Sequence, residues 1–265
     1  MRDEFSDLIN RLNDPSIAEL DIINWASPIP AFGNPSISKI ATLGLNPSDK
    51  EFIDDGGQEL ANSKRRFQTL NSFGIANWTE ISSDQLQILV DQCNDYFIRK
   101  PYDSWFKRLD FLISGTSMSY YFPSREACHL DLVPYATAVK WGNLSTMQKI
   151  KLLNQYGDIL GRIIQNSMIR ILVLNGKTVI NNLQKISDVS LTVSEKPNWN
   201  LPRGNTNNVK GYSYVGYLTQ IGGIELGKKI LILGFNHNIQ SSFGVTSAVQ
   251  QEIRNWITEE AKEHI

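Results

Sequence analysis

The sequence predicts an α/β fold, a three-layer α/β/α sandwich around a mostly parallel central sheet. Apolar runs of strand length recur along the chain, at residues 39–45, 127–135, 169–174 and 228–235. Longer segments with a helical spacing of apolar residues separate these runs. Strands that alternate with helices indicate a parallel sheet with helices on both faces. No repeat or linker divides the sequence, so we expect residues 1–265 to form a single domain, with 1–30 as an N-terminal helical and loop extension.

The helices are expected from local patterns between the strands. Residues 1–24 should form one or two short helices. The segment 54–75 begins with flexible glycines and then has a helical pattern, and two clearer helical patterns lie within 82–113. Residues 147–168 form the most regular amphipathic pattern, with one apolar face.

The C-terminal third predicts one further strand and one further helix. Residues 212–221 alternate enough to indicate an added strand or hairpin. The last helix should begin near Ser247, with Gln250 three positions later as a possible capping box.

The composition indicates a globular protein without membrane segments. Hydrophobic residues make up 41% and charged residues 20%, and the net charge of −1 gives no sign of a strongly basic nucleic-acid binder. There is no apolar run of membrane-spanning length, and the charged N-terminus lacks a signal region, so we expect a cytoplasmic protein. Two cysteines define neither a disulfide framework nor a metal site, and we expect no cofactor.

Polar motifs follow three of the predicted strands. These are Asn46-Pro47-Ser48, Asn175-Gly176 and Asn236-His237-Asn238, while the run at 127–135 carries His129 and Asp131. Ligands of open α/β sheets bind at the carboxyl ends of the strands. The sequence therefore predicts a polar pocket along that edge.

Several common motifs fail on inspection. The tetrapeptide at 175–178 resembles the end of a phosphate-binding loop, but isoleucine stands at 171 where glycine is required. Cys128 and His129 should point to opposite faces of a strand, which makes a zinc site improbable. No G-x-S-x-G elbow anchors a hydrolase triad.

Three segments, taken together, carry a family resemblance. "GLNPS" at 44–48, "HLDLVPYAT" at 129–137 and "GFNHNIQSS" at 234–242 occur in the order that is typical of the uracil-DNA glycosylase superfamily. The chain resembles this family over residues 25–250, and departs from it at Asn238, where proline is usual. The resemblance implies a monomeric, monofunctional base-excision enzyme that acts on DNA with water and without a metal or nicotinamide cofactor.

Two side chains would carry the chemistry that the resemblance implies. Asn46 would orient a water molecule near the sugar through its carbonyl oxygen, and His237 would donate a hydrogen bond to the departing base. Both residues also have ordinary explanations, since an asparagine before proline often forms a turn and a loop histidine often bonds to the backbone.

The base is expected to be cytosine-like rather than uracil. Asp131 stands where the family usually has asparagine, and an ionised carboxylate accepts from the cytosine amine but repels the uracil O4. Ser48 stands where uracil-specific relatives have a bulky aromatic residue, so a substituent at position 5 of the base could fit. Modified cytosines of phage DNA carry such a substituent, and a role in defence would follow. Asp131 could instead hold a lysine or cap a turn. A uracil or deaminated-base repair enzyme is the first competing function.

Further residues are candidates for stacking and for contacts to DNA. Phe67 or Phe32 could stack on the extruded base, although either could belong to the core. The last loop offers polar groups that could bind phosphates, and a phenylalanine that could wedge into the duplex. A pair of arginines could contact the DNA backbone or form an ion pair with Glu59. These candidates are Asn238, Gln240, Ser241, Ser242 and Phe243, with Arg65 and Arg66 as the basic pair. A catalytically silent nucleic-acid binding module and a small-molecule nucleotide hydrolase are the second and third competing functions.

Overall fold

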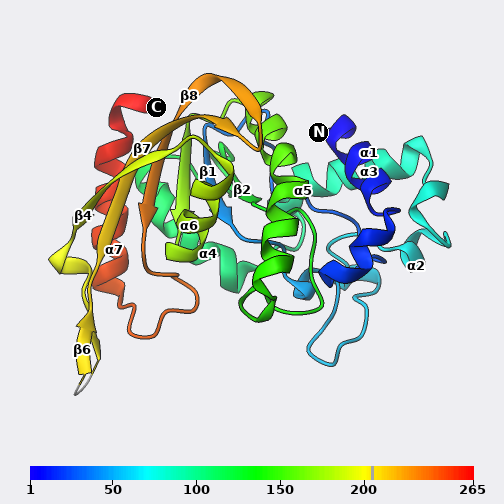
Figure 1. Ribbon diagram of the computed structural model, residues 1–265, viewed down its shortest axis with the longest axis horizontal. Helices are drawn as coiled ribbons and strands as arrows, with labels where there is room; N and C mark the ends of the chain where they lie inside the picture. Colours follow the sequence, from blue (N-terminus) through cyan, green and yellow to red (C-terminus); the bar gives the residue numbers. More distant parts are fainter. Residues whose placement is uncertain (204–205) are drawn as a thin grey trace.

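Four parallel strands form the centre of the protein in the computed structural model, which describes residues 1–203 and 206–265 (Figure 1). They are β1 (Ile40–Gly44), β2 (Ala127–Asp131), β3 (Ile171–Asn175) and β8 (Ile224–Phe235). Within the described residues, the main sheet has six strands in the order β2-β1-β3-β8-β7-β4. The expected α/β fold with a mostly parallel central sheet is confirmed.

Apolar side chains explain why these strands lie at the centre. Every residue of β1, β2 and β3 is buried, as are the last six residues of β8. Parallel strands that are covered on both faces have such nearly continuous apolar runs. The few polar residues within them, such as Thr42, His129 and Asp131, are consequently exceptions that need partners.

Helices cover both faces of the sheet. Figure 1 shows α5 (Thr146–Gln165) and α6 (Lys177–Ile186) in front of it, and α4 (Asp103–Ile113) and α7 (Ser247–Ala261) behind it. The two rear helices also pack against each other. α5 begins with a capping box in which Ser145 and Gln148 bond reciprocally, and its apolar stripe faces the sheet.

Antiparallel strands extend the sheet beyond β8. The expected strand at 212–221 is confirmed as β7 (Tyr212–Ile221), which pairs with β8 on one side and with β4 (Ser190–Glu195) on the other. A separate two-stranded ribbon, β5 (Leu201–Arg203) and β6 (Thr206–Val209), projects past the end of this extension (Figure 1).

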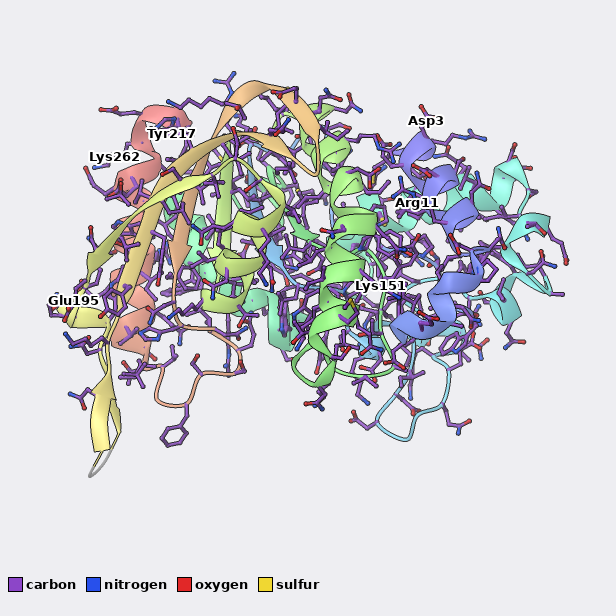
Figure 2. The ribbon with its side chains drawn as sticks, in the orientation of Figure 1. Asp3, Arg11, Lys151, Glu195, Tyr217 and Lys262 are labelled. Atoms are coloured by element: carbon purple, nitrogen blue, oxygen red, sulfur yellow. The ribbon has the colours of Figure 1, made fainter. Side chains whose placement is uncertain are left out.

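The N-terminal extension is tied to the body of the protein. Arg11 of α1 (Arg2–Arg11) bonds to both carboxylate oxygens of Asp158 on α5, at 2.8 and 2.6 Å, and Figure 2 shows these two helices side by side. Farther along, the backbone of Phe32 exchanges two hydrogen bonds of 2.8 Å with His129. The extension therefore covers the outer edge of β2 and delivers Phe32 to the carboxyl end of the sheet.

The structure differs from the sequence-based expectation in several places. Most of 54–75 is not helical, because its backbone bonds to other segments, and only α2 (Leu70–Phe73) and a 3₁₀ turn form there. The last helix begins at Ser247 as expected, but Thr246 caps it and not the expected pair of Ser247 and Gln250. The helix α6 and the strands β4, β5 and β6 are additions to the expected elements. The remaining helix is α3 (Ser83–Asn94), and the short 3₁₀ turns are Pro15–Leu20, Asp49–Glu51, Asn62–Lys64, Trp78–Glu80, Tyr96–Ile98, Ser114–Thr116, Trp141–Asn143, Pro197–Trp199 and Lys262–His264.

The described part of the chain contains no helix that is long and apolar enough to cross a membrane. Cys93 and Cys128 are unpaired and buried, and burial raises the pKa of each thiol to about 12. Thiols with such a high pKa remain protonated at neutral pH and are weak nucleophiles. Neither cysteine is a candidate for nucleophilic catalysis.

Candidate active site at the carboxyl ends of the strands

A cavity of about 490 Å³ opens where the strand order reverses. From β1 the chain proceeds to β2 on one side, and from β3 it proceeds towards β8 on the other, so the loops after β1 and β3 diverge. The cavity lies in the crevice between them. Its lining includes Phe32, Gly44, Asn46, Ser48, Glu51, Tyr102, Trp105, Phe106, His129, Asp131, Lys140, Asn175 and Asn238.

The Asn46 amide is held in a fixed orientation. Its Nδ2 donates to the Thr137 hydroxyl at 3.0 Å and to the Tyr135 carbonyl at 3.3 Å. Thr137 in turn donates to the Val139 carbonyl, so its oxygen is an acceptor towards Asn46. Because these groups require an N–H donor, the nitrogen is identified and Oδ1 is the atom left for a ligand. The local bond to the Pro47 carbonyl, at 3.2 Å, shows that Asn46 also shapes the turn.

Asp131 and His129 lie side by side on one face of β2. The Nε2 atom of His129 is 3.4 Å from Oδ1 of Asp131, and both side chains are almost completely buried. They project over Gly44 of the neighbouring strand, where a Cβ atom would stand 2.3 Å from Oδ1 of Asp131. Glycine at position 44 thus gives the carboxylate and the imidazole the room that they occupy.

A chain of hydroxyl groups supports the imidazole from behind. Nδ1 of His129 is 2.7 Å from the Thr42 hydroxyl, which is 2.5 Å from the hydroxyl of Tyr120. All three groups are buried. When Tyr120 donates to Thr42 and Thr42 donates to Nδ1, the imidazole carries its proton on Nε2, facing Asp131 and the cavity.

Aromatic rings form the cavity wall around His129. The ring centroids of Trp105, Phe106 and Phe32 lie 5.0, 5.4 and 5.6 Å from that of the imidazole. Phe67, in contrast, does not line the cavity. It is 1% exposed and packs behind Phe32 at a centroid distance of 5.7 Å, so it belongs to the core.

Glu51 is a buried carboxylate that sequence reasoning missed. It lines the cavity, is 3% exposed, and accepts hydrogen bonds of 2.9 Å at both oxygens from the Tyr96 hydroxyl. Burial raises its pKa to about 7, although Arg66 and Tyr96 act to lower it, and the charge of Asp131 contributes to the increase. A carboxyl group with this pKa can exchange protons at neutral pH.

The loop after β8 reaches the cavity through Asn238. Its Oδ1 accepts from the backbone amides of Gln240 and Ser241, both at 3.0 Å, which leaves Nδ2 as the outward atom. Gln240 is committed to the protein: it accepts from Asn175 at 2.7 Å and donates to the Trp105 carbonyl at 3.2 Å. Both ends of its side-chain amide therefore hold the loop in place.

The His237 imidazole does not face this cavity. It is 2% exposed, its Nε2 lies 2.7 Å from the Trp199 carbonyl, and it lines a second cavity on the other side of the loop. Successive residues of the loop point in opposite directions, so Asn238 lines the same cavity as Asn46 while His237 does not. The structure thus fails to bring together the two side chains that the resemblance assigns to catalysis.

Of the remaining candidates, Ser48 lies on the loop after β1 and the others lie on the loop after β8. Ser48 lies at the cavity edge, and its hydroxyl caps the 3₁₀ turn that carries Glu51. Ser241 is exposed, and Phe243 is 74% exposed. The Ser242 hydroxyl accepts a hydrogen bond of 2.9 Å from the backbone N–H of Asn238.

The two arginines are less available for DNA than expected. Arg66 donates to the carbonyls of Lys50 and Lys100, at 2.7 and 3.2 Å, and its Nε lies 4.0 Å from Glu51. It braces the cavity wall and does not pair with Glu59, which bonds to Thr69 and Asn71 instead. Arg65 is half-buried, with Nε lacking a hydrogen-bond partner within the described residues.

No group of three or more histidine, cysteine or acidic side chains within residues 1–203 and 206–265 is arranged to hold a metal ion. The lining of the first cavity includes three acidic residues, two lysines, one imidazole and three side-chain amides, beside aromatic walls. Comparison of the sequence with protein-family models finds no match, and a search of curated proteins finds no significant match.

Proposed function

We propose that the chain is a DNA N-glycosylase of the uracil-DNA glycosylase type that removes a cytosine-like base by water-assisted hydrolysis. The observation that carries this proposal is the arrangement of Asn46, Asp131 and His129 around one aromatic-walled cavity. Enzymes that act on a DNA base extrude it into such a pocket, and hold it by stacking and by hydrogen bonds to its edge. The cavity volume is typical of small-molecule sites, which span roughly 300–1,000 Å³.

Asp131 supplies the preference for cytosine. In its ionised form it offers only acceptors, which suits the exocyclic amine and disfavours the uracil O4. His129 lies beside it and completes the polar floor on which the base edge rests. Phe106 and Trp105 supply apolar surface against which the ring can pack.

Hydrolysis uses Asn46 and Glu51. The Asn46 carbonyl oxygen orients a water molecule towards C1′ of the deoxyribose, and the Glu51 carboxylate takes the proton from this water. The water oxygen forms a bond to C1′, the C1′–N1 bond breaks, and its electron pair leaves with the base. The pKa of Glu51, about 7, matches this step.

Asn238 stabilises the departing base in place of His237. Its Nδ2 donates to the O2 atom of the pyrimidine as negative charge develops there. The orientation of the Asn238 amide, with Oδ1 bonded to the loop backbone, supports this assignment. A neutral donor at this position is sufficient for electrostatic stabilisation, since it need not transfer a proton.

The enzyme distinguishes its substrate from ordinary cytosine by the substituent at position 5 of the base. Ser48 at the rim is small, and the cavity is larger than a bare pyrimidine requires. An enzyme that removed ordinary cytosine would damage its own genome, so the substrate is a 5-modified cytosine such as occurs in phage DNA. Defence against phage is the corresponding biological role.

A panel of oligonucleotides tests the proposal. Single- and double-stranded DNA containing cytosine, 5-methylcytosine, 5-hydroxymethylcytosine, glucosylated 5-hydroxymethylcytosine or uracil is incubated with the protein and scored for abasic sites. We expect release of a modified cytosine, its loss in Asn46→Ala, and no change in Asn10→Ala, which removes an exposed amide from α1.

Different outcomes would replace the proposal with a specific competing function. Release of uracil alone would indicate a repair enzyme. DNA binding without release of any base would indicate a binding module, and turnover of free nucleosides without DNA dependence would indicate a nucleotide hydrolase.

A further inference from the structure

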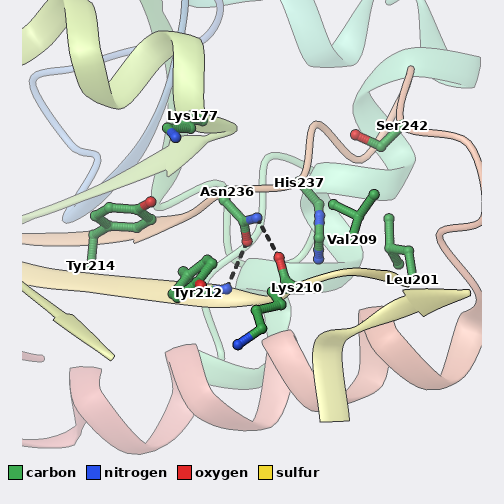
Figure 3. Close-up of a pocket in the computed structure, with 9 residues that line it drawn as sticks. All are labelled: Lys177, Leu201, Val209, Lys210, Tyr212, Tyr214, Asn236, His237 and Ser242. Atoms are coloured by element: carbon green, nitrogen blue, oxygen red, sulfur yellow. Dashed lines mark hydrogen bonds between the residues drawn. The ribbon is translucent and has the colours of Figure 1, made fainter. Parts of the chain in front are cut away.

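A second cavity, of about 540 Å³, lies on the other side of the loop after β8 (Figure 3). It is formed by the beginning of β7, the beginning of α6, the β5–β6 ribbon and the loop itself. The residues that line it are Lys177, Leu201, Val209, Lys210, Tyr212, Tyr214, Asn236, His237 and Ser242. None of these nine residues has a carboxylate.

The charge of the second cavity is positive. Lys177 is exposed at its upper margin, and Figure 3 shows its ammonium group on the same side as the Tyr214 hydroxyl. Lys210 has its ammonium 3.0 Å from Glu195, outside the lining, so that carboxylate is already neutralised. Because this ion pair leaves Lys210 without net charge as well, Lys177 is the cation that an anionic group meets on entering the cavity, and no acid stands among the lining residues.

Two half-buried tyrosines give the cavity aromatic surface. Tyr212 and Tyr214 lie on β7 at alternate positions, so their side chains project from the same face of the strand. Asn236 fixes this end of β7 by accepting from the Tyr212 amide and donating to the Lys210 carbonyl, both at 2.8 Å (Figure 3). The rings are consequently held on a rigid element instead of a loop.

We propose that this second cavity binds the nucleic-acid strand next to the extruded nucleotide, with a phosphate at Lys177 and a flanking base against Tyr214 or Tyr212. Cationic groups beside aromatic rings are the usual composition of single-strand binding surfaces. The inference rests on the proposed function and names where its substrate strand continues.

The position of the second cavity suits a continuous strand. Asn175 and Asn238 line the first cavity, while Lys177 and His237, one or two residues away along the chain, line the second. A Cβ atom at Gly176 would lie 3.3 Å from Cα of Asn238, so the two loops are in close contact. One strand can thus place a base in the first cavity and its neighbour in the second.

Equilibrium binding of labelled DNA tests the proposal. The probe is an unmodified single-stranded oligonucleotide, and fluorescence anisotropy is measured over a range of salt concentrations. We expect Lys177→Ala to weaken binding and to reduce the slope of log K against log salt by about one. Tyr214→Ala should raise Kd by about tenfold, because one stacked base is lost.

Matched variants serve as controls on the same elements. Lys185→Ala changes a lysine at the opposite end of α6, and Tyr217→Ala changes an exposed tyrosine farther along β7. Both should bind as the unchanged protein does. Lys177 is exposed, so its variant is expected to fold, and thermal unfolding checks this for Tyr214→Ala.

The outcomes separate this inference from the proposed function. Weaker binding in the two test variants supports the second cavity as a strand site, even when no base is excised. Equal binding in test and control variants overturns it, even when excision is found. Displacement of the oligonucleotide by inorganic phosphate or a mononucleotide as effectively as by unlabelled oligonucleotide also overturns it, since the cavity would then be a small-molecule site.

Discussion

Asp131 rests directly above Gly44, and a single methyl group at position 44 would come within 2.3 Å of its carboxylate oxygen. The same methyl group would lie 3.0 Å from Nε2 of His129. Both contacts are too short, so the two side chains would have to shift from their positions. Gly44 of the 44–48 motif is thus required by Asp131 and His129 of the 129–137 motif.

Gly44→Ala should therefore displace Asp131 and His129 from the cavity floor. We expect a loss of excision of at least about tenfold, together with a stability loss of about 1–3 kcal/mol from overpacking. Single-turnover kinetics and urea unfolding measure the two effects. The control is Gly142→Ala, where a Cβ atom meets nothing within 4 Å. Normal kinetics in Gly44→Ala would contradict a role of this floor in base binding.

Asp131→Asn should change the preferred base. An amide both donates and accepts, so it can pair with the O4 and N3–H groups of uracil. We expect uracil release to appear or increase while release of modified cytosine falls by about tenfold, the equivalent of one good hydrogen bond. Competition between two labelled oligonucleotides measures the ratio. An unchanged ratio would show that Asp131 does not contact the base.

Glu51→Gln should alter the pH dependence of the reaction. The carboxylate form acts as the base, so excision by the unchanged protein should rise as the pH passes about 7 and then remain level. The variant should be slower and show no such rise. Glu263→Gln, an exposed glutamate near the C-terminus, serves as the control. A rise near pH 7 that survives in Glu51→Gln would assign it to another group.

The same carboxyl group links pH to stability. Its pKa is raised from 4.5 to about 7 in the folded protein, so the folded state holds the proton more tightly. This stabilisation is complete below pH 4.5 and is lost as the pH rises through 7, and amounts to ~3 kcal/mol. Glu51→Gln should be more stable than the unchanged protein at pH 8, and the difference should shrink at low pH. Denaturant unfolding at both pH values measures this.

Thr42→Val should break the chain of hydroxyls behind His129. The substitution keeps the shape but leaves the Tyr120 hydroxyl and Nδ1 of His129 without their shared partner, which costs about 1–3 kcal/mol. Adding Tyr120→Phe should recover part of this loss, because the orphaned hydroxyl is then gone. A double-mutant cycle measures the coupling, and strict additivity would argue against a connected chain.

Phe243→Ala should affect double-stranded substrates more than single-stranded ones. Phe243 is 74% exposed on the loop that borders both cavities, where an apolar wedge could fill the gap left by an extruded base. We expect slower excision from duplex DNA and little change on single strands. Phe122→Ala, which removes a similarly exposed phenylalanine, is the control. Equal slowing on both substrates would exclude the wedge.

The strands and the cavity could be predicted from the sequence because both depend on local pattern. The apolar runs at β1 and β3 end in asparagine, and this places Asn46 and Asn175 at one edge of a parallel sheet. The helix expected within 54–75 is wrong for the opposite reason. The backbone there bonds to distant segments, for example from Ser27 to Gln68, and no local propensity reports such contacts.

The chemistry of individual side chains was harder to predict. Nothing in the sequence around Glu51 marks it as unusual. Burial and, to a smaller extent, the charge of Asp131 raise its pKa, and these surroundings come from other segments of the chain. The role of His129 beside Asp131 had a usable signal, because two residues separated by one position on a strand lie on one face. The direction of His237 depends on a loop turn that the sequence does not specify.

Gln240 has a mechanical consequence for access to the first cavity. One amide fastens three separate parts of the chain: its own loop, the tip of β3 through Asn175, and the start of α4 through the Trp105 carbonyl. An outward movement of Trp105 that admitted a larger ligand would have to break the hydrogen bond to Gln240 or move Gln240 with it. Trp105 and the loop after β8, which separates the two cavities, must therefore move together.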